Sequence, residues 1–252
     1  MSAPAEEVGP DPVLVEQIRE RAGTIRRRIA ASTDREVRIV CVTKAHPVQV
    51  AASALAAGFE DLGENYAQEL QAKAALLDGP GRSDRAAPAE PDPQPQGSAV
   101  VPRWHFIGRL QSNKVRSLAH TVSLWHTVDR ASLADEIARR APGARVLVQL
   151  DLAGMPGRGG IDPAEAPALV AHCTAAGLRV EGLMGVGVPG PPEASRAGFR
   201  LLDTMAADLG LRERSMGMSG DLEVAVEEGA TIVRIGSALV GPRASSGGGE
   251  SR

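Results

Sequence analysis

Short hydrophobic runs alternate with amphipathic segments along most of the chain. Residues 13–31 carry Val13, Ile18, Ile25 and Ile29 with Arg and Glu between them, which predicts a leading amphipathic helix. Beyond it, runs of β-branched or other apolar residues are each followed by a helical pattern. We predict strands at residues 38–42, 59–62, 104–107, 123–128, 145–150, 180–184, 214–216 and 231–235.

The helical patterns between these strands complete a repeating unit. They predict helices at residues 48–57, 66–77, 114–119, 132–140, 163–176, 193–209 and 222–228, with a last helix that is short or absent. Strict alternation implies parallel strands joined by right-handed crossovers. The fold class is therefore α/β, and eight units favour a single (β/α)8 TIM-type barrel with an extra N-terminal helix. An open doubly wound sheet is the alternative, but it usually has fewer strands, and no G-x-G-x-x-G follows the first strand.

Three segments depart from this pattern. The Pro-rich segment 78–102 has almost no large apolar residue before Val100, so we expect a disordered insert away from the active end of the barrel. The acidic, Pro/Ala-rich residues 1–12 and the tail 244–252 are expected to be disordered ends. The predicted barrel domain spans residues 13–243, with the insert at about 78–102.

Composition narrows the classes of function. A net charge of −3 on 252 residues gives no indication of a nucleic-acid or membrane-surface partner. No apolar run approaches the roughly 18–20 residues that span a bilayer, and the first residues lack the features of a secretory signal. Cys41 and Cys173 do not lie at metal-ligand spacing, so we expect them to be small buried residues of a cytoplasmic protein. With 2% aromatic residues the chain offers no obvious adhesive patch, and we expect a monomer.

Lysine is rare in this chain. Lys44, Lys73 and Lys114 are the only lysines among 28 basic residues. Guanidinium is not deprotonated to a nucleophile, so a chain that has largely replaced lysine with arginine would keep lysine where amine chemistry is needed. Lys44 follows the first predicted strand, at the end of the barrel where the active sites of this fold lie. Partial burial there lowers the pKa of an amine and favours Schiff-base chemistry with a carbonyl compound.

Two segments rich in glycine and serine follow the seventh and eighth predicted strands. They are SMGMSGD at 215–221 and IGS at 235–237, the places where barrels often bind a phosphate. Glycine lets backbone N–H groups approach an anion, while Ser215, Ser219 and Ser237 supply hydroxyls. The pair of segments therefore predicts a phosphate site.

Three further polar residues lie on or near strand ends. Arg234 would neutralise a phosphate, face a cofactor ring nitrogen inside the barrel or form an ion pair outside it, and the alternation of its neighbours does not decide between these. Asn65 and His105 would either orient a ligand or serve as structural polar groups. For His105, taken alone, we favour the structural role.

Several motifs together resemble the pyridoxal phosphate homeostasis proteins. The most specific strings are WHFIG-x-LQSNK at 104–114 and SMGMSGD at 215–221. Shorter matches are VTK at 42–44, GEN at 63–65, GLM at 182–184 and GATIVRIG at 229–236. The resemblance covers about residues 13–242 except the insert, and implies a single-domain barrel similar to the N-terminal domain of alanine racemase.

The resemblance implies a cofactor, pyridoxal 5'-phosphate (PLP), held as a Schiff base on Lys44. It also implies that Arg234 faces the pyridine nitrogen. The other cofactor-binding residues expected from it are Ser215, Ser219, Gly236 and Ser237 at the phosphate, together with Asn65, His105, Met184 and Met218. Members of this family buffer PLP or deliver it to PLP-dependent apoenzymes without established catalysis, so we expect PLP homeostasis and no enzyme.

The sequence departs from the family pattern in places and leaves two other functions open. Ala45-His46 and Gly185-Val186-Gly187 differ from the usual residues, and Arg158 stands where relatives usually have lysine; if a second lysine takes PLP from Lys44 in the family, this chain lacks that one. A one-domain amino-acid racemase would need a second acid or base, but Tyr66, the only tyrosine, is expected to pack. A phosphate-sugar or aldolase-type barrel would use Lys44 without PLP.

Overall fold

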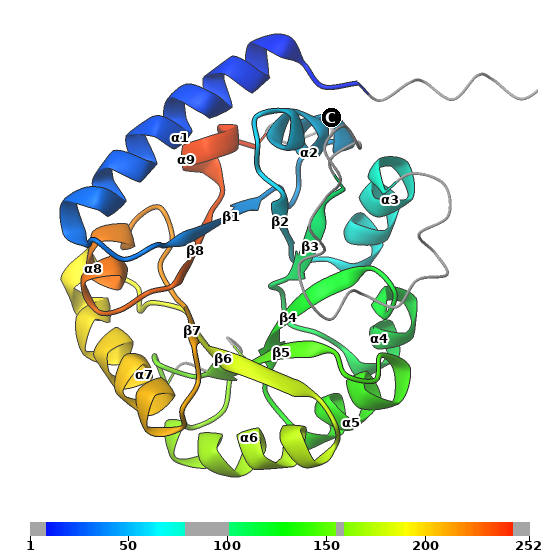
Figure 1. Ribbon diagram of the computed structural model, residues 1–252, viewed down its shortest axis with the longest axis vertical. Coiled ribbons are helices and arrows are strands. Elements are labelled where there is room, and N and C mark those ends of the chain that lie inside the picture. Colours follow the sequence, from blue (N-terminus) through cyan, green and yellow to red (C-terminus); the bar gives the residue numbers. More distant parts are fainter. Residues whose placement is uncertain (1–8, 79–100, 155–158, 244–252) are drawn as a thin grey trace, which may run out of the picture.

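A closed barrel of parallel strands forms the centre of the molecule. The structure, a computed structural model, describes residues 9–78, 101–154 and 159–243. Within these ranges eight strands pair in chain order and the last pairs with the first, which excludes the open doubly wound sheet (Figure 1). The strands are β1 (Arg38–Val42), β2 (Asp61–Glu64), β3 (Arg103–Phe106), β4 (Val122–Val128), β5 (Arg145–Leu150), β6 (Arg179–Gly185), β7 (Glu213–Ser215) and β8 (Ile232–Ile235).

Helices surround the barrel (Figure 1). They are α1 (Pro12–Ser32), α2 (Val48–Ala56), α3 (Ala67–Leu77), α4 (Ser112–Leu118), α5 (Ala131–Arg140), α6 (Ala166–Ala175), α7 (Arg196–Asp208), α8 (Leu222–Glu227) and α9 (Ser237–Val240). Two 3₁₀ turns, η1 (Pro163–Glu165) and η2 (Pro192–Ser195), replace the first turns of two predicted helices. The prediction of a short last helix is confirmed, since α9 has four residues.

The leading helix α1 covers the seam where the barrel closes. The carboxylate of Asp11 accepts hydrogen bonds from the N–H groups of Val13 and Leu14 and so caps its first turn. Its buried stripe packs against α2, α8 and α9 and consists of Val15, Ile18, Ala22, Ile25 and Ile29. Because α9 is too short to cover the β8–β1 pair alone, α1 takes over much of that role. The predicted apolar position Val13 is the exception and is 67% exposed.

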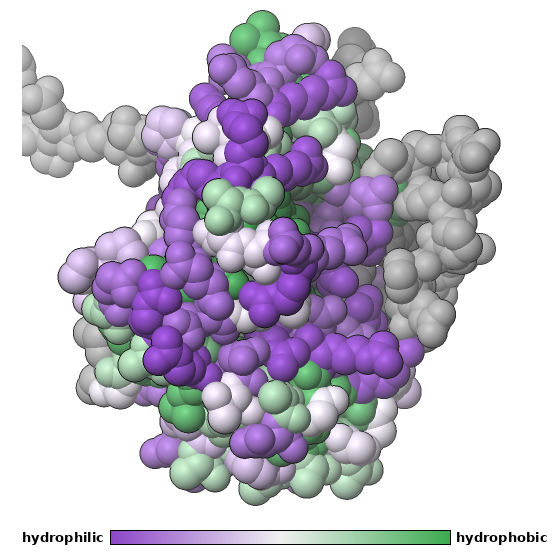
Figure 2. Space-filling model, turned by 60° about the vertical axis from the view of Figure 1, so that its left-hand side comes forward, coloured by the Kyte–Doolittle hydropathy of each residue, from purple (hydrophilic) through white to green (hydrophobic). Residues whose placement is uncertain are grey.

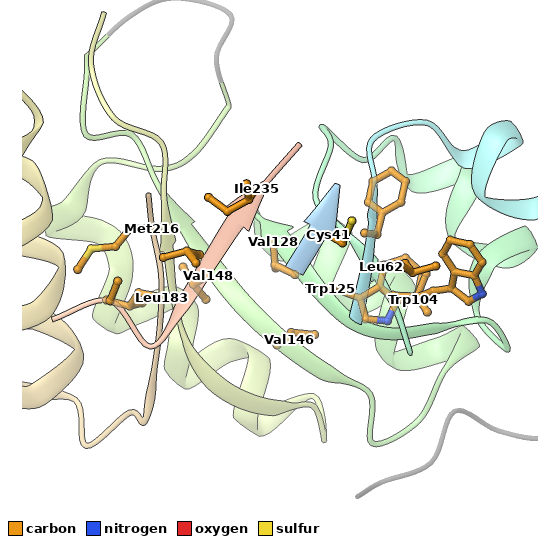
Figure 3. Packing of buried hydrophobic residues seen from close by; sticks show 14 of the residues in the cluster. Cys41, Leu62, Trp104, Trp125, Val128, Val146, Val148, Leu183, Met216 and Ile235 are labelled. Atoms are coloured by element: carbon orange, nitrogen blue, oxygen red, sulfur yellow. The ribbon is translucent and has the colours of Figure 1, made fainter. Parts of the chain in front are cut away.

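The main hydrophobic core lies between the barrel and its helices. The outward residues of the strands fill this layer, and Figure 3 shows Trp104 and Trp125 beside Leu62 and Cys41 on one side of it. Cys41 and Cys173 are both buried and unpaired, as predicted. This layer explains why the strands look almost continuously apolar in the sequence.

The second strand lies later in the chain than predicted. We expected it at residues 59–62, but β2 spans Asp61–Glu64 and pairs with β3 from Asp61–Arg103 to Glu64–Phe106. The prediction followed hydrophobicity, whereas Asp61 and Glu64 lie buried in the strand because each carboxylate has a cationic partner. Gly63 and Glu64 therefore belong to the strand, and Asn65 is the first residue after it.

Ion pairs fill the end of the barrel interior where the strands begin. Arg103–Asp61 joins β3 to β2 and Arg145–Glu181 joins β5 to β6, whereas Arg38–Glu213 joins β1 to β7 across β8. The charges of Glu213 and Asp61 both raise the pKa of Arg145 after the larger effect of its bond to Glu181, so the pairs lie close together. Above them a small apolar cluster, Val40, Leu124, Leu147, Met184 and Ile232, fills the middle of the barrel.

The outer face formed by α1, α8 and α7 is mostly hydrophilic, with hydrophobic residues scattered over it (Figure 2). Among the described residues, no helix combines the length and apolarity needed to cross a membrane. Residues 1–8, most of the predicted insert (79–100), Arg158 with its neighbours (155–158) and the predicted tail (244–252) lie outside the described residues.

Candidate cofactor site

Lys44 stands at the mouth of the barrel, two residues beyond the end of β1. The register of β1 with β2 pairs Val42 with Gly63, so Lys44 lies at the level of Asn65. The side chain is half-buried, and burial lowers the pKa of its amine, with further lowering by the charges of Arg243 and Arg234. A partly desolvated amine between two cations is suited to nucleophilic attack on an aldehyde.

The turn after Lys44 has an unusual backbone. Ala45 has φ of 57°, the left-handed conformation that a residue with a Cβ adopts at a cost of roughly 1–2 kcal/mol. Its N–H donates a 2.6 Å hydrogen bond to Oε1 of Glu69, which holds this conformation. This left-handed conformation of Ala45 turns the chain sharply directly after Lys44.

A buried ionic cluster holds the residues next to Lys44. The ammonium group of Lys73 donates to Oε1 of Glu64 at 2.6 Å, to Oε1 of Glu69 at 2.9 Å and to the carbonyl of Thr43 at 2.7 Å. The hydroxyl of Thr43 also donates to Glu64, at 2.6 Å. Burial raises the pKa of Glu64 although Lys73 opposes it. Lys73 is thus a structural lysine, and the suggestion that rare lysines mark amine chemistry is wrong for it.

Arg234 points into the barrel. Its NH1 group donates to the carbonyl and the hydroxyl oxygen of Ser215, at 2.7 and 2.8 Å, and NH2 donates to the carbonyl of Gly185 at 2.9 Å. The neighbours Val233 and Ile235 face the outer core, as alternation requires. Burial lowers the pKa of Arg234 to about 10, so it remains a cation at neutral pH. Its hydrogen-bond partners are neutral oxygens and the charge of Asp221 only partly opposes the effect of burial, so a buried positive charge lies at the site.

The expected phosphate residues lie around the ends of β7 and β8 but differ in exposure. Ser215 is fully buried, Ser219 is half-buried and Ser237 is exposed at the start of α9. Met218 is 40% exposed, and its N–H donates to Asp221. Gly236 directly precedes α9. The two segments thus meet at one edge of the barrel mouth, as the sequence predicted.

Glycine is required at one point of the β7 segment. Gly217 has φ of 93°, and a Cβ there would stand 2.5 Å from the Cβ of Ala225 in α8. The turn therefore brings the backbone of this segment close to α8, where only glycine fits.

The remaining predicted residues lie at different depths. Met184 is 2% exposed and belongs to the apolar cluster in the barrel, and its backbone pairs with Ser215. His105 is 2% exposed, and both of its ring nitrogens have partners, Asp61 and His126. Both ring nitrogens of His105 thus face protein groups, and its contact with the cofactor stays a prediction.

Asn65 and Tyr66 border a cavity of about 730 Å³ beside the mouth, which Arg109 and Lys114 also line. The side-chain oxygen of Asn65 is buried and has no hydrogen-bond partner. Tyr66 is 60% exposed, so our expectation that it packs is wrong. It stands at the N-cap of α3, where the chain leaves β2 and the ring turns outward over the cavity.

Several residues of the site were missed by sequence reasoning. His126 is fully buried in β4 and lies between Ser215 and His105, and Arg243 acts electrostatically on Lys44 from the C-terminal side. Glu64 and Glu69 hold the segment before and after Lys44. His126 stands two residues after Leu124, which faces the barrel interior, so a histidine at an inward position of the strand is the signal that marks it.

The donors gathered at the mouth fit PLP. The amine of Lys44 suits an aldehyde, and the guanidinium of Arg234, whose hydrogen-bond partners are neutral oxygens, suits the lone pair of an unprotonated ring nitrogen. Ser219, Ser237 and the N–H groups at the start of α9 suit a phosphate, and the unpartnered oxygen of Asn65 offers an acceptor.

Comparison with known proteins agrees with this geometry. Residues 13–244 match the family model described as "Alanine racemase, N-terminal domain". The "Pyridoxal phosphate homeostasis protein" of Pseudomonas aeruginosa is 36% identical over 241 residues, covering 91% of this chain and 96% of that protein. That of Deinococcus radiodurans is 38% identical over 235 residues, covering 90% and 98%. The structure of PipY from Synechococcus elongatus with PLP bound is similar with a TM-score of 0.71 and 32% identity, covering 89% of this chain and 100% of PipY.

Proposed function

Because the chain belongs to the alanine racemase N-terminal domain family, and within it to the pyridoxal phosphate homeostasis proteins, we propose that it binds PLP and takes part in its homeostasis. The observation that carries this proposal is the half-buried amine of Lys44, whose pKa is lowered by burial and by two arginines at the mouth of the barrel. The PLP-bound relative of the same fold supports it.

Lys44 would hold PLP covalently but reversibly. The neutral Nζ would be the nucleophile for the aldehyde of PLP, and the linkage of an amine to an aldehyde, made with loss of water, is open to hydrolysis or to exchange with another amine. The lowered pKa of Lys44 favours the neutral amine that begins this step. A bond of this kind suits a protein that buffers PLP or delivers it to apoenzymes.

Arg234 argues against catalysis by this chain. A guanidinium facing the ring nitrogen would keep that nitrogen unprotonated, which weakens the ring as an electron sink. Tyr66, the only tyrosine and the residue considered above as a second acid or base for a racemase, is 60% exposed at the start of α3. We therefore propose a PLP carrier rather than a racemase. We also propose that it acts as a monomer in the cytoplasm, where reducing conditions keep cysteines such as Cys41 and Cys173 as free thiols.

The test is reduction of the loaded protein with borohydride followed by peptide mapping. We expect a visible absorption band that borohydride removes, and a pyridoxyl group on Lys44. Lys44→Ala should lose the band and keep its thermal unfolding temperature, whereas Lys114→Ala should keep both. Binding of a phosphate sugar without a visible band, or rapid racemisation of L-alanine by the loaded protein, would overturn the proposal in favour of the aldolase-type or racemase alternative.

A further inference from the structure

Five buried polar side chains form one continuous series of hydrogen bonds through the barrel. His105 lies 2.9 Å from Oδ1 of Asp61 through Nε2 and 2.8 Å from Nε2 of His126 through Nδ1. Nδ1 of His126 lies 2.9 Å from the hydroxyl of Ser215, which lies 2.8 Å from NH1 of Arg234. None of the five is more than 7% exposed. The series connects the ion pairs at the base of the barrel with the guanidinium at its mouth.

The charge of Asp61 fixes one end of the series. Arg103 holds both of its oxygens, through Nε to Oδ1 and NH2 to Oδ2, each at 2.9 Å. Although burial works in the opposite direction, the hydrogen bonds from Arg103 and His105 hold the pKa of Asp61 well below its usual range. A carboxylate only accepts, so His105 donates its Nε2–H to Asp61; because Arg103 already holds both oxygens of this carboxylate, we place the ring proton of His105 on Nε2.

The proton positions then follow along the series. With its proton on Nε2, His105 accepts at Nδ1, so His126 donates its Nε2–H. Burial holds the pKa of His126 well below its usual range, and the charge of Arg234 acts in the same direction, so this ring is neutral; with its proton on Nε2 it accepts at Nδ1. The hydroxyl of Ser215 is the donor to that nitrogen and accepts from Arg234.

These assignments leave Ser215 without a proton for a phosphate. Its single hydroxyl proton is directed to His126, and its oxygen faces the guanidinium of Arg234. Its burial agrees with this, whereas Ser219 and Ser237 on the same edge reach the surface. The expectation that all three serines bind the phosphate therefore does not fit the contacts of Ser215.

We propose that Ser215 and His126 are positioning residues that orient Arg234 toward the cofactor ring, and that Ser215 is not a phosphate ligand. The proposal rests on the proposed function, because it concerns how the same site holds PLP. The hydroxyl of Ser215 and the carbonyls of Ser215 and Gly185 together hold the NH1 and NH2 groups of Arg234. The guanidinium therefore keeps its position without help from a bound cofactor. The arginine is thereby ready for the ring before the cofactor binds.

The first experiment compares the affinities of PLP and pyridoxal, which differ by the phosphate. Ser215→Ala should weaken both ligands by the same factor, about three- to tenfold, and leave their ratio within about twofold of that of the unaltered protein. Ser219→Ala is the matched control and should lower the preference for PLP about tenfold or more, because it removes a donor to a charged group. A fall of the ratio in Ser215→Ala as large as that in Ser219→Ala would overturn the proposal.

The second experiment uses two replacements of His126 that each keep one of its contacts. The side-chain oxygen of Asn stands where Nδ1 stands, so His126→Asn keeps the acceptor for Ser215. The side-chain nitrogen of Gln stands where Nε2 stands, so His126→Gln keeps the contact with His105 and loses the acceptor for Ser215. Nitrogen NMR of PLP labelled at the ring nitrogen should give the same change of chemical shift in His126→Gln, Ser215→Ala and their double variant. His126→Asn should remain near the unaltered protein. Equal shifts in His126→Asn and His126→Gln, or no shift in Ser215→Ala, would contradict the proposal.

These results distinguish failure of this proposal from failure of the proposed function. If the unaltered protein gives no visible band and no pyridoxyl group on Lys44, PLP binding itself is wrong. If it binds PLP but the Ser215 variant loses the preference for phosphate, only the positioning role is wrong. Thermal unfolding of each variant shows whether it is folded. If Ser215→Ala does not fold, the comparison of His126→Asn with His126→Gln still tests the proposal.

Discussion

The ammonium group of Lys73 donates a 2.7 Å hydrogen bond to the backbone carbonyl of Thr43, the residue directly before Lys44. Ala45, directly after Lys44, donates its N–H to Glu69, which also accepts from Lys73. The amine at the barrel mouth thus stands on a short segment held on both sides by one buried cluster. These contacts hold the backbone on both sides of Lys44 and so fix the position of its Cα, from which the flexible side chain extends.

Removal of Lys73 should therefore destabilise the protein. We expect Lys73→Met to lower the free energy of unfolding by about 3–5 kcal/mol, since it leaves the carboxylate of Glu64 buried without its cation. The double variant Lys73→Met/Glu64→Gln should lose less than the sum of the single variants. Urea unfolding measures both effects. Lys114→Met, a lysine outside the cluster, is the control, and a loss of similar size there would refute this account.

The backbone of Ala45 predicts a stabilising substitution. Glycine adopts a positive φ without the steric cost of a Cβ, so Ala45→Gly should raise the free energy of unfolding by up to about 1 kcal/mol. The N–H bond to Glu69 remains available in this variant. Ala45→Val, with a branched Cβ, should destabilise the protein instead. Thermal unfolding would count against the assigned conformation if both variants were destabilised equally.

Asp61 should contribute stability that disappears in acid. Its pKa is lower in the folded protein than in the unfolded chain, where it is about 3.9, so its contribution is present above about pH 4. The contribution declines as the pH falls from there toward the folded pKa. Asp61→Asn should cost about 3–5 kcal/mol at pH 7 because Arg103 and His105 lose their shared anion. The gap to the unaltered protein should narrow at pH 3.

Denaturant unfolding at both pH values measures this effect. Asp135→Asn is the control because Asp135 pairs with His172 on the surface, and it should change stability by less than about 1 kcal/mol. A gap for Asp61→Asn that stays constant between pH 7 and pH 3 would show that the low pKa does not stabilise the fold.

Arg243 should set the pH at which Lys44 reacts. Burial makes the largest contribution to the lowered pKa of Lys44, and the charge of Arg243 comes next. Removing that charge with Arg243→Gln raises the pKa, so the rate of PLP association should rise with pH through a midpoint higher than in the unaltered protein. Arg243→Lys keeps the charge and should leave the midpoint nearly unchanged. Stopped-flow absorbance measures the rates, and an unmoved midpoint in Arg243→Gln would exclude this role.

The barrel was predictable because the outer faces of its strands all meet helices. A run such as Arg145–Leu150 is apolar enough for its bounds to be predicted from hydrophobicity alone, and β5 has these bounds. The second strand was misplaced because buried carboxylates interrupt its apolar pattern. Hydrophobicity does not show that Lys73, nine residues after Glu64, supplies the counter-charge.

The polar contacts inside the barrel could not be predicted from the sequence. Alternation indicates which residues of a strand share a side, but not which polar groups of distant strands meet. His126 and Ser215 are 89 residues apart, and nothing local to either indicates the other. Lys44 and the β7 and β8 segments were identified because the fold fixes the end of the barrel where they lie, whereas the series from Asp61 to Arg234 depends on side-chain geometry.

The burial of Lys73 also affects how labelling of the chain is to be read. Aldehydes and acylating reagents modify most proteins indiscriminately through their many surface amines. In this chain Lys73 is 3% exposed and fully engaged, so Lys44 and Lys114 remain as accessible lysines. Adventitious adducts on lysine are therefore confined to one known position, and a single Lys114→Arg replacement would give a chain in which the stoichiometry of lysine modification reports directly on Lys44.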